Sequence, residues 1–283
     1  MKLASIRING NPVWGRVVGD EIIVPDKAFL HANPRLSDAL SKDALEMLPD
    51  VRESARVPVA EALFDPVIPS PGRIICVGIN YMAHIREMGR EPPVYPWLFV
   101  RWPDSQVGHL QPIVKPFVSE KYDFEGELAV VIGKTARHVR RADALDYVAG
   151  YTCFMDGSLR DWQNHGTQFT PGKNFKASGS FGPWLVTADE IVDPARLNIE
   201  TRLNGEIMQQ APLSDLRFDV PALIEYCSTF AELQPGDVIS TGTPGGVGFA
   251  RKPPVWLQPG DTIEVAIDRV GVLRNPVIAE QPV

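Results

Sequence analysis

The sequence has few cysteines, and their number argues against a protein held together by disulfides. Cys76, Cys153 and Cys227 are the three cysteines in 283 residues, and each lies in an apolar run. An odd number in such surroundings is typical of reduced core thiols, and the spacing matches no cysteine metal site. We therefore expect neither a secreted disulfide scaffold nor structural zinc.

Long apolar runs are also missing. No stretch approaches the roughly 20 residues that a membrane-spanning helix needs. The N-terminus carries Arg7 and Asn9 where a secretory signal would have its apolar core. Both features predict a cytoplasmic protein without a membrane partner.

Positive charge is in short supply. The chain has 28 Lys and Arg against 35 Asp and Glu, a formal net charge of −7, and its basic residues form no cluster. Nucleic acids and anionic membranes attract basic surfaces, so neither is an expected partner.

The chain divides into two predicted parts. Residues 1–70 predict a small α+β domain, with strands over 2–8 and 14–18 and a helix over 37–48. Three prolines between positions 66 and 71 break regular structure and predict a linker. Residues 71–283 form the second part, whose short strands and frequent turn signals predict a mixed, mostly β domain with few helices.

A run of carboxylates borders a β-branched segment. Residues 130–132 predict a strand, and because residues two apart on a strand share a face, Glu125 and Glu127 should point the same way. A second apolar segment, 148–155, ends on Asp156, a third carboxylate. Neighbouring carboxylates are costly to bury without a cation, and three of them suit Mg²⁺ or Mn²⁺. The alternative is a solvated strand face, the usual setting of an isolated Glu-x-Glu.

An imidazole and a carboxylate follow the strand predicted over 73–78. His84 and Glu87 are three residues apart, so they are neighbours on one face of a helical turn. Such a pair can act in acid–base chemistry, although most pairs at this spacing are exposed surface contacts. Gly89 and two prolines follow directly, which predicts a short, mobile lid over residues 82–93.

Five motifs in this order carry a resemblance. They are the segments 77–88, 122–134, 158–163, 172–175 and 242–248. Together they resemble the fumarylacetoacetate hydrolase family over roughly residues 71–276, and in particular its acylpyruvase and 2-hydroxyhepta-2,4-diene-1,7-dioate isomerase members. The resemblance implies a β-roll catalytic domain, a homodimer, and one divalent ion per subunit.

The resemblance also implies roles for individual residues. His84 and Glu87 would activate water when the lid closes, Lys173 would serve the substrate and metal site, and Arg160 would support the acidic cluster electrostatically. The loop around Gly242 and Thr243 would offer backbone N–H groups to a ligand anion. Further substrate contacts are implied for Tyr81, Gln163, Gly242 and Thr243.

One position departs from the family pattern. Arg101 stands where the family usually has Lys, and Arg offers a two-pronged fork in place of a point charge. We consider substrate binding and a structural ion pair as equal alternatives for this side chain.

The predicted function is metal-dependent hydrolysis of a carbon–carbon bond in a β-diketo acid of acylpyruvate type, in the breakdown of aromatic compounds. The substrate would be a small 2-oxo acid bound through its carboxylate and keto oxygens. Alternatives that use the same site are oxaloacetate decarboxylation, hydroxydienedioate isomerisation, and a lyase or dehydratase reaction. A different class would be an inactive member that acts as a scaffold, but retention of all three carboxylates and of the His–Glu pair argues against it.

Overall fold

The computed structural model describes residues 1–87, 89 and 91–281, and its largest element is a mixed twelve-stranded sheet. Most neighbouring strands in it are antiparallel, while β17 pairs with β6, and β14 with β8, in parallel. The strands run in the order β4 (Glu53–Pro58), β3 (Glu21–Pro25), β2 (Asn11–Val18), β1 (Lys2–Ile8), β14 (Gly179–Thr187), β12 (Val148–Met155), β11 (Gly126–Ile132), β17 (Val238–Ser240), β6 (Ile74–Gly78) and β7 (Trp97–Arg101), with β5 (Leu63–Phe64) beside β1 and β8 (Gln106–Val107) beside β14.

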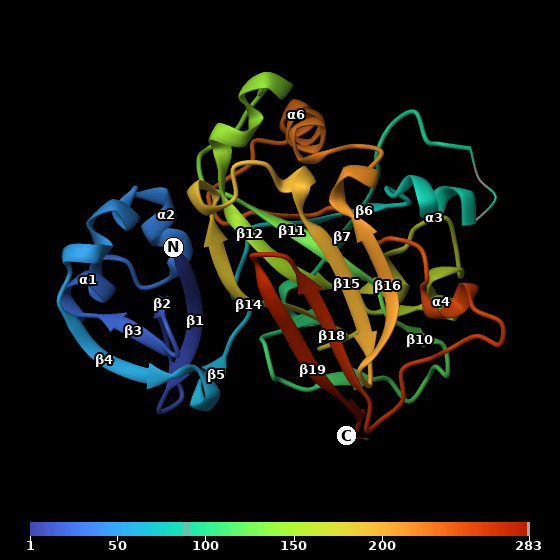
Figure 1. Cartoon of the computed structure of the whole chain (residues 1–283), viewed down its shortest axis with the longest axis horizontal. Helices are drawn as coiled ribbons and strands as arrows, with labels where there is room; N and C mark the ends of the chain where they lie inside the picture. The colour runs from blue at the N-terminus through green and yellow to red at the C-terminus, as the bar shows by residue number, and fades with distance from the viewer. Residues whose placement is uncertain (88, 90, 282–283) are drawn as a thin grey trace.

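A second, five-stranded sheet packs against the first. Its order is β16 (Glu206–Pro212), β15 (Asn198–Leu203), β18 (Thr262–Ile267), β19 (Gly271–Ala279) and β9 (Ile113–Lys115). The turn between β15 and β16 is the Asn204-Gly205 pair, and both residues have the positive φ that this tight hairpin requires. Figure 1 shows β15, β16, β18 and β19 in front of β11 and β12. The prediction of a mixed, mostly β fold is confirmed.

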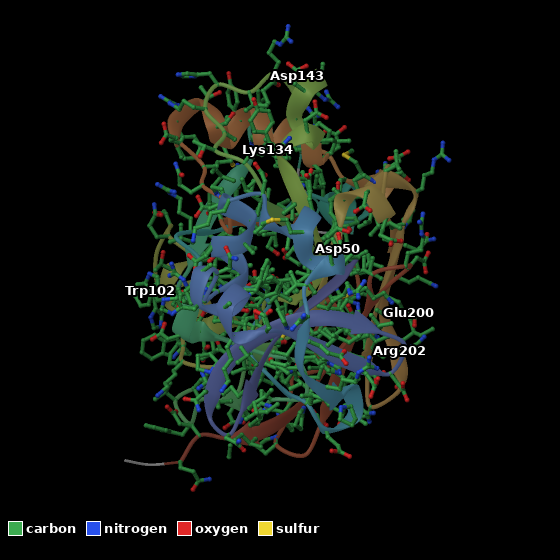
Figure 2. All side chains as sticks on the ribbon, turned by 90° about the vertical axis from the view of Figure 1, so that its left-hand side faces the viewer. Asp50, Trp102, Lys134, Asp143, Glu200 and Arg202 are labelled. Carbon is green, nitrogen blue, oxygen red and sulfur yellow. The ribbon has the colours of Figure 1, made fainter. Side chains whose placement is uncertain are left out.

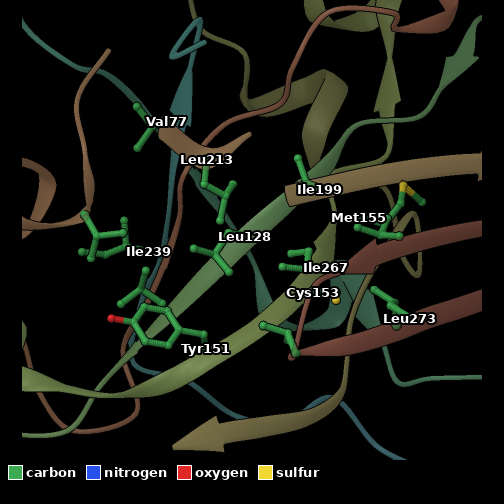
Figure 3. Packing of buried hydrophobic residues seen from close by; sticks show 14 of the residues in the cluster. Val77, Leu128, Tyr151, Cys153, Met155, Ile199, Leu213, Ile239, Ile267 and Leu273 are labelled. Atoms are coloured by element: carbon green, nitrogen blue, oxygen red, sulfur yellow. The ribbon is translucent and has the colours of Figure 1, made fainter. Parts of the chain in front are cut away.

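The main core lies between the two sheets. Leu128 and Cys153 from the large sheet pack with Ile199, Ile267 and Leu273 from the smaller one (Figure 3), and all five side chains are buried. Burying side chains of this size contributes roughly 1.5–3 kcal/mol each, so the core fixes β11 and β12 firmly. All three cysteines are buried and free, which agrees with the prediction of reduced thiols.

The N-terminal residues occupy the blue left-hand part of Figure 1 and continue the large sheet, because β1 pairs with β14. The predicted strands over 2–8 and 14–18 are confirmed as β1 and β2. The predicted helix over 37–48 is wrong as a single element. It is divided into α2 (Leu36–Ser41) and a 3₁₀ helix (Ala44–Asp50), because Asp43 between them adopts a left-handed conformation.

The remaining helices are short and lie outside the sheets. These helices are α1 (Lys27–Ala32), α3 (Met82–Glu87), α4 (Arg160–Gln163), α5 (Thr170–Lys173) and α6 (Val220–Phe230). None of the described helices is long and apolar enough to cross a membrane.

Figure 2 shows side chains at two edges of the molecule. Trp102 on one side, and Glu200 with Arg202 on the other, are at least partly exposed.

Candidate active site

The three predicted carboxylates meet at one end of the β11–β12 pair. Glu127 lies opposite Phe154 in the antiparallel register, and the N–H of Asp156 donates to the carbonyl of Glu125 at 2.8 Å. Carboxylate oxygens of Glu125, Glu127 and Asp156 all lie within 4.8 Å of one another, and all three residues are buried. The strand alternation that predicted a shared face for the two glutamates therefore agrees with the structure.

Gly126 allows the two glutamates to be so close to the second sheet. A Cβ at this position would lie 2.0 Å from the hydroxyl oxygen of Thr201 on β15. Any side chain larger than hydrogen would push β11 away from β15, and the carboxylates would move with it.

Three cations balance two of the carboxylates. Lys173 Nζ lies 2.6 Å from Glu125 and 2.6 Å from Asp156. Arg101 donates to the other oxygen of Asp156 at 2.5 Å, and Arg160 lies 2.6 Å from the other oxygen of Glu125. Although burial alone would raise it, Arg160 and Lys173 hold the pKa of Glu125 well below its ordinary value.

Glu127 has a different environment. Its carboxylate accepts hydrogen bonds from the hydroxyl of Ser240 at 2.6 Å and from the N–H of Gly242 at 2.9 Å, and both donors are neutral. Burial, followed by the charges of Asp156 and Glu125, raises the pKa of Glu127 well above its ordinary value. Glu127 is therefore the carboxylate of the three that gains most from a cation bound beside it.

The donor set of the cluster suits Mg²⁺ or Mn²⁺. All three candidate ligands offer carboxylate oxygen, the donor that these hard ions prefer. The geometry supports the fit, because the three carboxylates lie within 4.8 Å of one another and the hydrogen-bond donors to Glu127 are neutral, so a cation beside Glu127 would stabilise its charged form. The residues present thus fit one divalent ion held by Glu125, Glu127 and Asp156.

A cavity of about 220 Å³ opens beside this cluster. Among the predicted site residues, His84, Gln163, Lys173 and Thr243 line it together with Glu125, Glu127 and Arg160. The cavity also has an apolar wall, which we define by five residues from four separate chain segments: Val77, Ile79, Phe99, Phe169 and Phe249.

His84 and Glu87 form the predicted pair on α3. The Nδ1 atom of His84 lies 2.8 Å from Glu87 Oε2, and the N–H of Gly246 donates to the same carboxylate at 3.2 Å. Glu87 therefore fixes the imidazole while the glycine loop fixes Glu87. Of the predicted lid over 82–93, positions 88 and 90 lie outside the described residues, and lid movement stays a prediction.

The glycine loop has a different use from the one expected for it. Three of its N–H groups donate to protein carboxylates: Gly242 to Glu127, Gly246 to Glu87, and Gly248 to Asp123. In this arrangement they are taken by the protein and are not offered to a ligand. The loop instead ties the carboxylate cluster to the His–Glu pair.

Arg101 and Tyr81 do not line the cavity. The Arg101 guanidinium is wholly buried behind Asp156 and also donates to Ser178 and to the carbonyl of Gly157. This position supports the ion-pair alternative for Arg101 and not direct substrate binding. Tyr81 is 0% exposed, so direct contact with a substrate would require movement of its surroundings.

Asp123 is a site residue that the sequence analysis missed. It is fully buried, accepts from Arg160 at 2.8 Å, and so holds the arginine that supports Glu125. The signal was available, because Asp123 stands two residues before Glu125 in the sequence, as Glu125 stands two residues before Glu127. In the structure Asp123 ends the short strand β10 (Tyr122–Asp123), and Glu125 lies between β10 and β11. The aromatic residues of the apolar wall were missed too, and their scattered positions gave no such signal.

A comparison with family models identifies the family. Residues 73–278 match the model described as fumarylacetoacetate (FAA) hydrolase, C-terminal. A curated relative, the mitochondrial oxaloacetate tautomerase Fahd2a of Rattus norvegicus, is 42% identical over 223 residues, which span 78% of this chain and 71% of the relative. The chain belongs to the fumarylacetoacetate hydrolase family.

Solved structures agree with this assignment. A putative HpcE protein from Mycobacterium smegmatis matches with a TM-score of 0.87 and 33% identity over 99% of this chain and 100% of the other. Maleylpyruvate hydrolase from Sphingobium sp. SYK-6 matches with a TM-score of 0.80 and 33% identity over the same shares of the two chains. The latter protein has also been solved with manganese(II) and pyruvate.

Proposed function

We propose that this member of the fumarylacetoacetate hydrolase family is a Mg²⁺- or Mn²⁺-dependent enzyme that hydrolyses a carbon–carbon bond in an acylpyruvate-type 2-oxo acid. The observation that carries the proposal is His84, held by Glu87, in the wall of the cavity that Glu125 and Glu127 also line. Water attack needs a general base next to the electrophile, and a histidine oriented by a carboxylate is a common solution.

The residues of the cavity divide the task between them. A divalent ion held by Glu125, Glu127 and Asp156 would polarise the 2-oxo group and stabilise negative charge on its oxygen. Lys173 and Arg160 add positive charge at the same end of the cavity. Gln163 and Thr243 line the cavity and remain our candidates for polar contacts to the substrate.

In the proposed reaction, the free ring nitrogen of His84 takes a proton from water, and the resulting hydroxide adds to the distal carbonyl carbon. The bond from that carbon to C3 then breaks, and its electron pair stays on C3 as the enolate of pyruvate. The imidazolium returns the proton to C3. One water and one acylpyruvate thus give one carboxylic acid and one pyruvate.

A second candidate is tautomerisation of oxaloacetate between its keto and enol forms. The observation in its favour is the 42% identity to a protein named oxaloacetate tautomerase. The reaction would use the same stabilisation of an enolate and a proton transfer at C3, but no attack by water.

The test is to replace His84 by Ala and to compare acetylpyruvate cleavage with oxaloacetate tautomerisation. We expect cleavage to fall at least ~100-fold, the usual scale for loss of a general base, while Mn²⁺ affinity by calorimetry stays unchanged. His31→Ala, which changes an exposed histidine on α1, is the matched control. If His84→Ala still cleaves acetylpyruvate at the wild-type rate, His84 is not the general base. A wild-type protein that tautomerises oxaloacetate and leaves acetylpyruvate intact would establish the second candidate instead.

A further inference from the structure

Ile79 has a backbone conformation that is unusual for its residue type. Its φ is +56°, in the left-handed region, where the branched Cβ of isoleucine is strained. Glycine and asparagine adopt this conformation with little strain, whereas isoleucine does not. Backbone strain of this kind concentrates at functional sites. Ile79 also lines the cavity beside the carboxylate cluster.

The neighbouring Asn80 imposes this conformation. Its side-chain amide donates to the carbonyls of Phe218 at 2.9 Å and Thr241 at 2.8 Å, and its side-chain oxygen accepts from the N–H of Phe218 at 2.9 Å. The backbone carbonyl of Asn80 accepts from the N–H of Arg217 at 2.7 Å. These bonds fix the chain after Ile79, and the pairing of Gly78 with Trp97 fixes the chain before it. Ile79 is therefore held in position with its side chain at the cavity.

The apolar wall continues beyond Ile79. Phe99 and Phe169 make an edge-to-face contact with ring centroids 5.7 Å apart. Phe99 also lies 4.9 Å from Lys173 Nζ, and Phe249 lies 4.6 Å from the Arg160 guanidinium, so the wall borders the cationic end of the cavity. A ligand held at the carboxylate cluster would extend along this wall.

Charge on the cavity surface limits what the far end of such a ligand can be. Among the described residues that line the cavity, Arg160 and Lys173 are the arginine and lysine side chains. Each is already paired with two carboxylates, Arg160 with Asp123 and Glu125, and Lys173 with Glu125 and Asp156. A second carboxylate on the ligand would meet the apolar wall without a cation of its own, which is unfavourable.

We propose that Ile79 is a specificity-determining residue, and that the site takes 2-oxo acids whose far end is an uncharged alkyl or aryl group in preference to 2-oxo dicarboxylates. The inference rests on the proposed function only in that a 2-oxo acid binds at the carboxylate cluster. It names acylpyruvates with an apolar acyl group as the substrate class.

The experiment measures binding, so that its result does not depend on which reaction occurs. Calorimetry on the Mn²⁺-loaded protein compares pyruvate with two six-carbon probes, 2-oxohexanoate and 2-oxoadipate, which differ in whether the tail ends in methyl or carboxylate. From the gain per buried methylene, we expect 2-oxohexanoate to bind at least ~10-fold more tightly than pyruvate and than 2-oxoadipate. A wild-type protein that binds 2-oxoadipate as tightly as 2-oxohexanoate would overturn the proposal.

Variants at position 79 then separate specificity from stability. Ile79→Gly should lose the preference for 2-oxohexanoate without a lower melting temperature, because glycine tolerates positive φ. Ile79→Lys should bind 2-oxoadipate ~10-fold more tightly than wild type, on the scale of one new charge-assisted contact. Leu110→Gly is the matched control, since Leu110 has a φ of +62° on an exposed turn away from the cavity.

If Ile79→Gly still prefers 2-oxohexanoate as strongly as the wild type does, Ile79 does not determine the specificity. If Ile79→Gly melts at a lower temperature than the wild type, the Ile79→Lys variant provides the test. An Ile79→Lys protein whose affinities for 2-oxohexanoate and 2-oxoadipate have the same ratio as in the wild type would contradict the proposal. The failure of the proposed function looks different: 2-oxohexanoate would be preferred as expected, but no acylpyruvate would be cleaved.

Discussion

Glu127→Gln should make the metal-free protein more stable and remove its response to metal. The substitution keeps an oxygen that accepts from Ser240 and Gly242, but it deletes one negative charge from the cluster. At 4.8 Å and an effective dielectric constant of about 20, two unit negative charges repel by about 3.5 kcal/mol. Glu127 has two such neighbours, Glu125 and Asp156.

Lys173 offsets part of this repulsion, since its charge lowers the pKa of Glu127 while the carboxylates raise it. Allowing it to cancel one of the two pairs leaves about 3.5 kcal/mol in favour of the variant. At about 2 °C per kcal/mol for a chain of this size, the melting temperature in EDTA should rise by about 7 °C.

The assay is thermal unfolding at pH 8 with EDTA and with Mn²⁺. At 100 times the dissociation constant, Mn²⁺ should stabilise the wild type by about 2.7 kcal/mol, and the variant should gain much less. Glu61→Gln, which neutralises an exposed carboxylate, should change neither measurement. A metal-free Glu127→Gln protein that is no more stable than the wild type would refute the electrostatic reasoning, and an unchanged response to Mn²⁺ would remove Glu127 from the metal site.

Two further predictions follow from the lid and from a partly buried histidine. Amide exchange in the described part of residues 82–93 should slow when oxalate is added to the Mn²⁺-loaded protein, because a bound anion favours the closed lid; equal exchange with and without oxalate would contradict this. Burial, with a smaller effect of Arg274, lowers the pKa of His109 to about 4. Between pH 6.5 and pH 4 the unfolded chain therefore binds a proton at His109 that the folded chain does not bind. The folded state loses stability as the pH falls through this range. His109→Gln should recover about 2.4 kcal/mol of that loss, measured by urea unfolding at pH 7 and pH 4.5 with His31→Gln as control. An equal loss in wild type and His109→Gln would show that His109 does not cause it.

Local patterns in the sequence determined much of the candidate site. The step of two from Glu125 to Glu127 predicts that both carboxylates share one face, and the three-residue step from His84 to Glu87 puts both on one helical turn, because backbone geometry sets these spacings. The order of the five motifs was enough to predict the family that the comparison with family models then identified. Homodimeric assembly, a cytoplasmic location and independent folding of residues 1–70 stay predictions.

Only the tertiary structure decided how the charges are paired. Arg101 is 55 residues from Asp156 in the chain and Gly248 is 125 residues from Asp123, and no local pattern specifies which carboxylate each of them meets. The same holds for the apolar wall, whose residues come from segments that only the packing of the two sheets and their loops brings together. Side-chain contacts between distant segments depend on the whole packed fold, whereas the facing of neighbours in one strand or helix depends on the backbone alone.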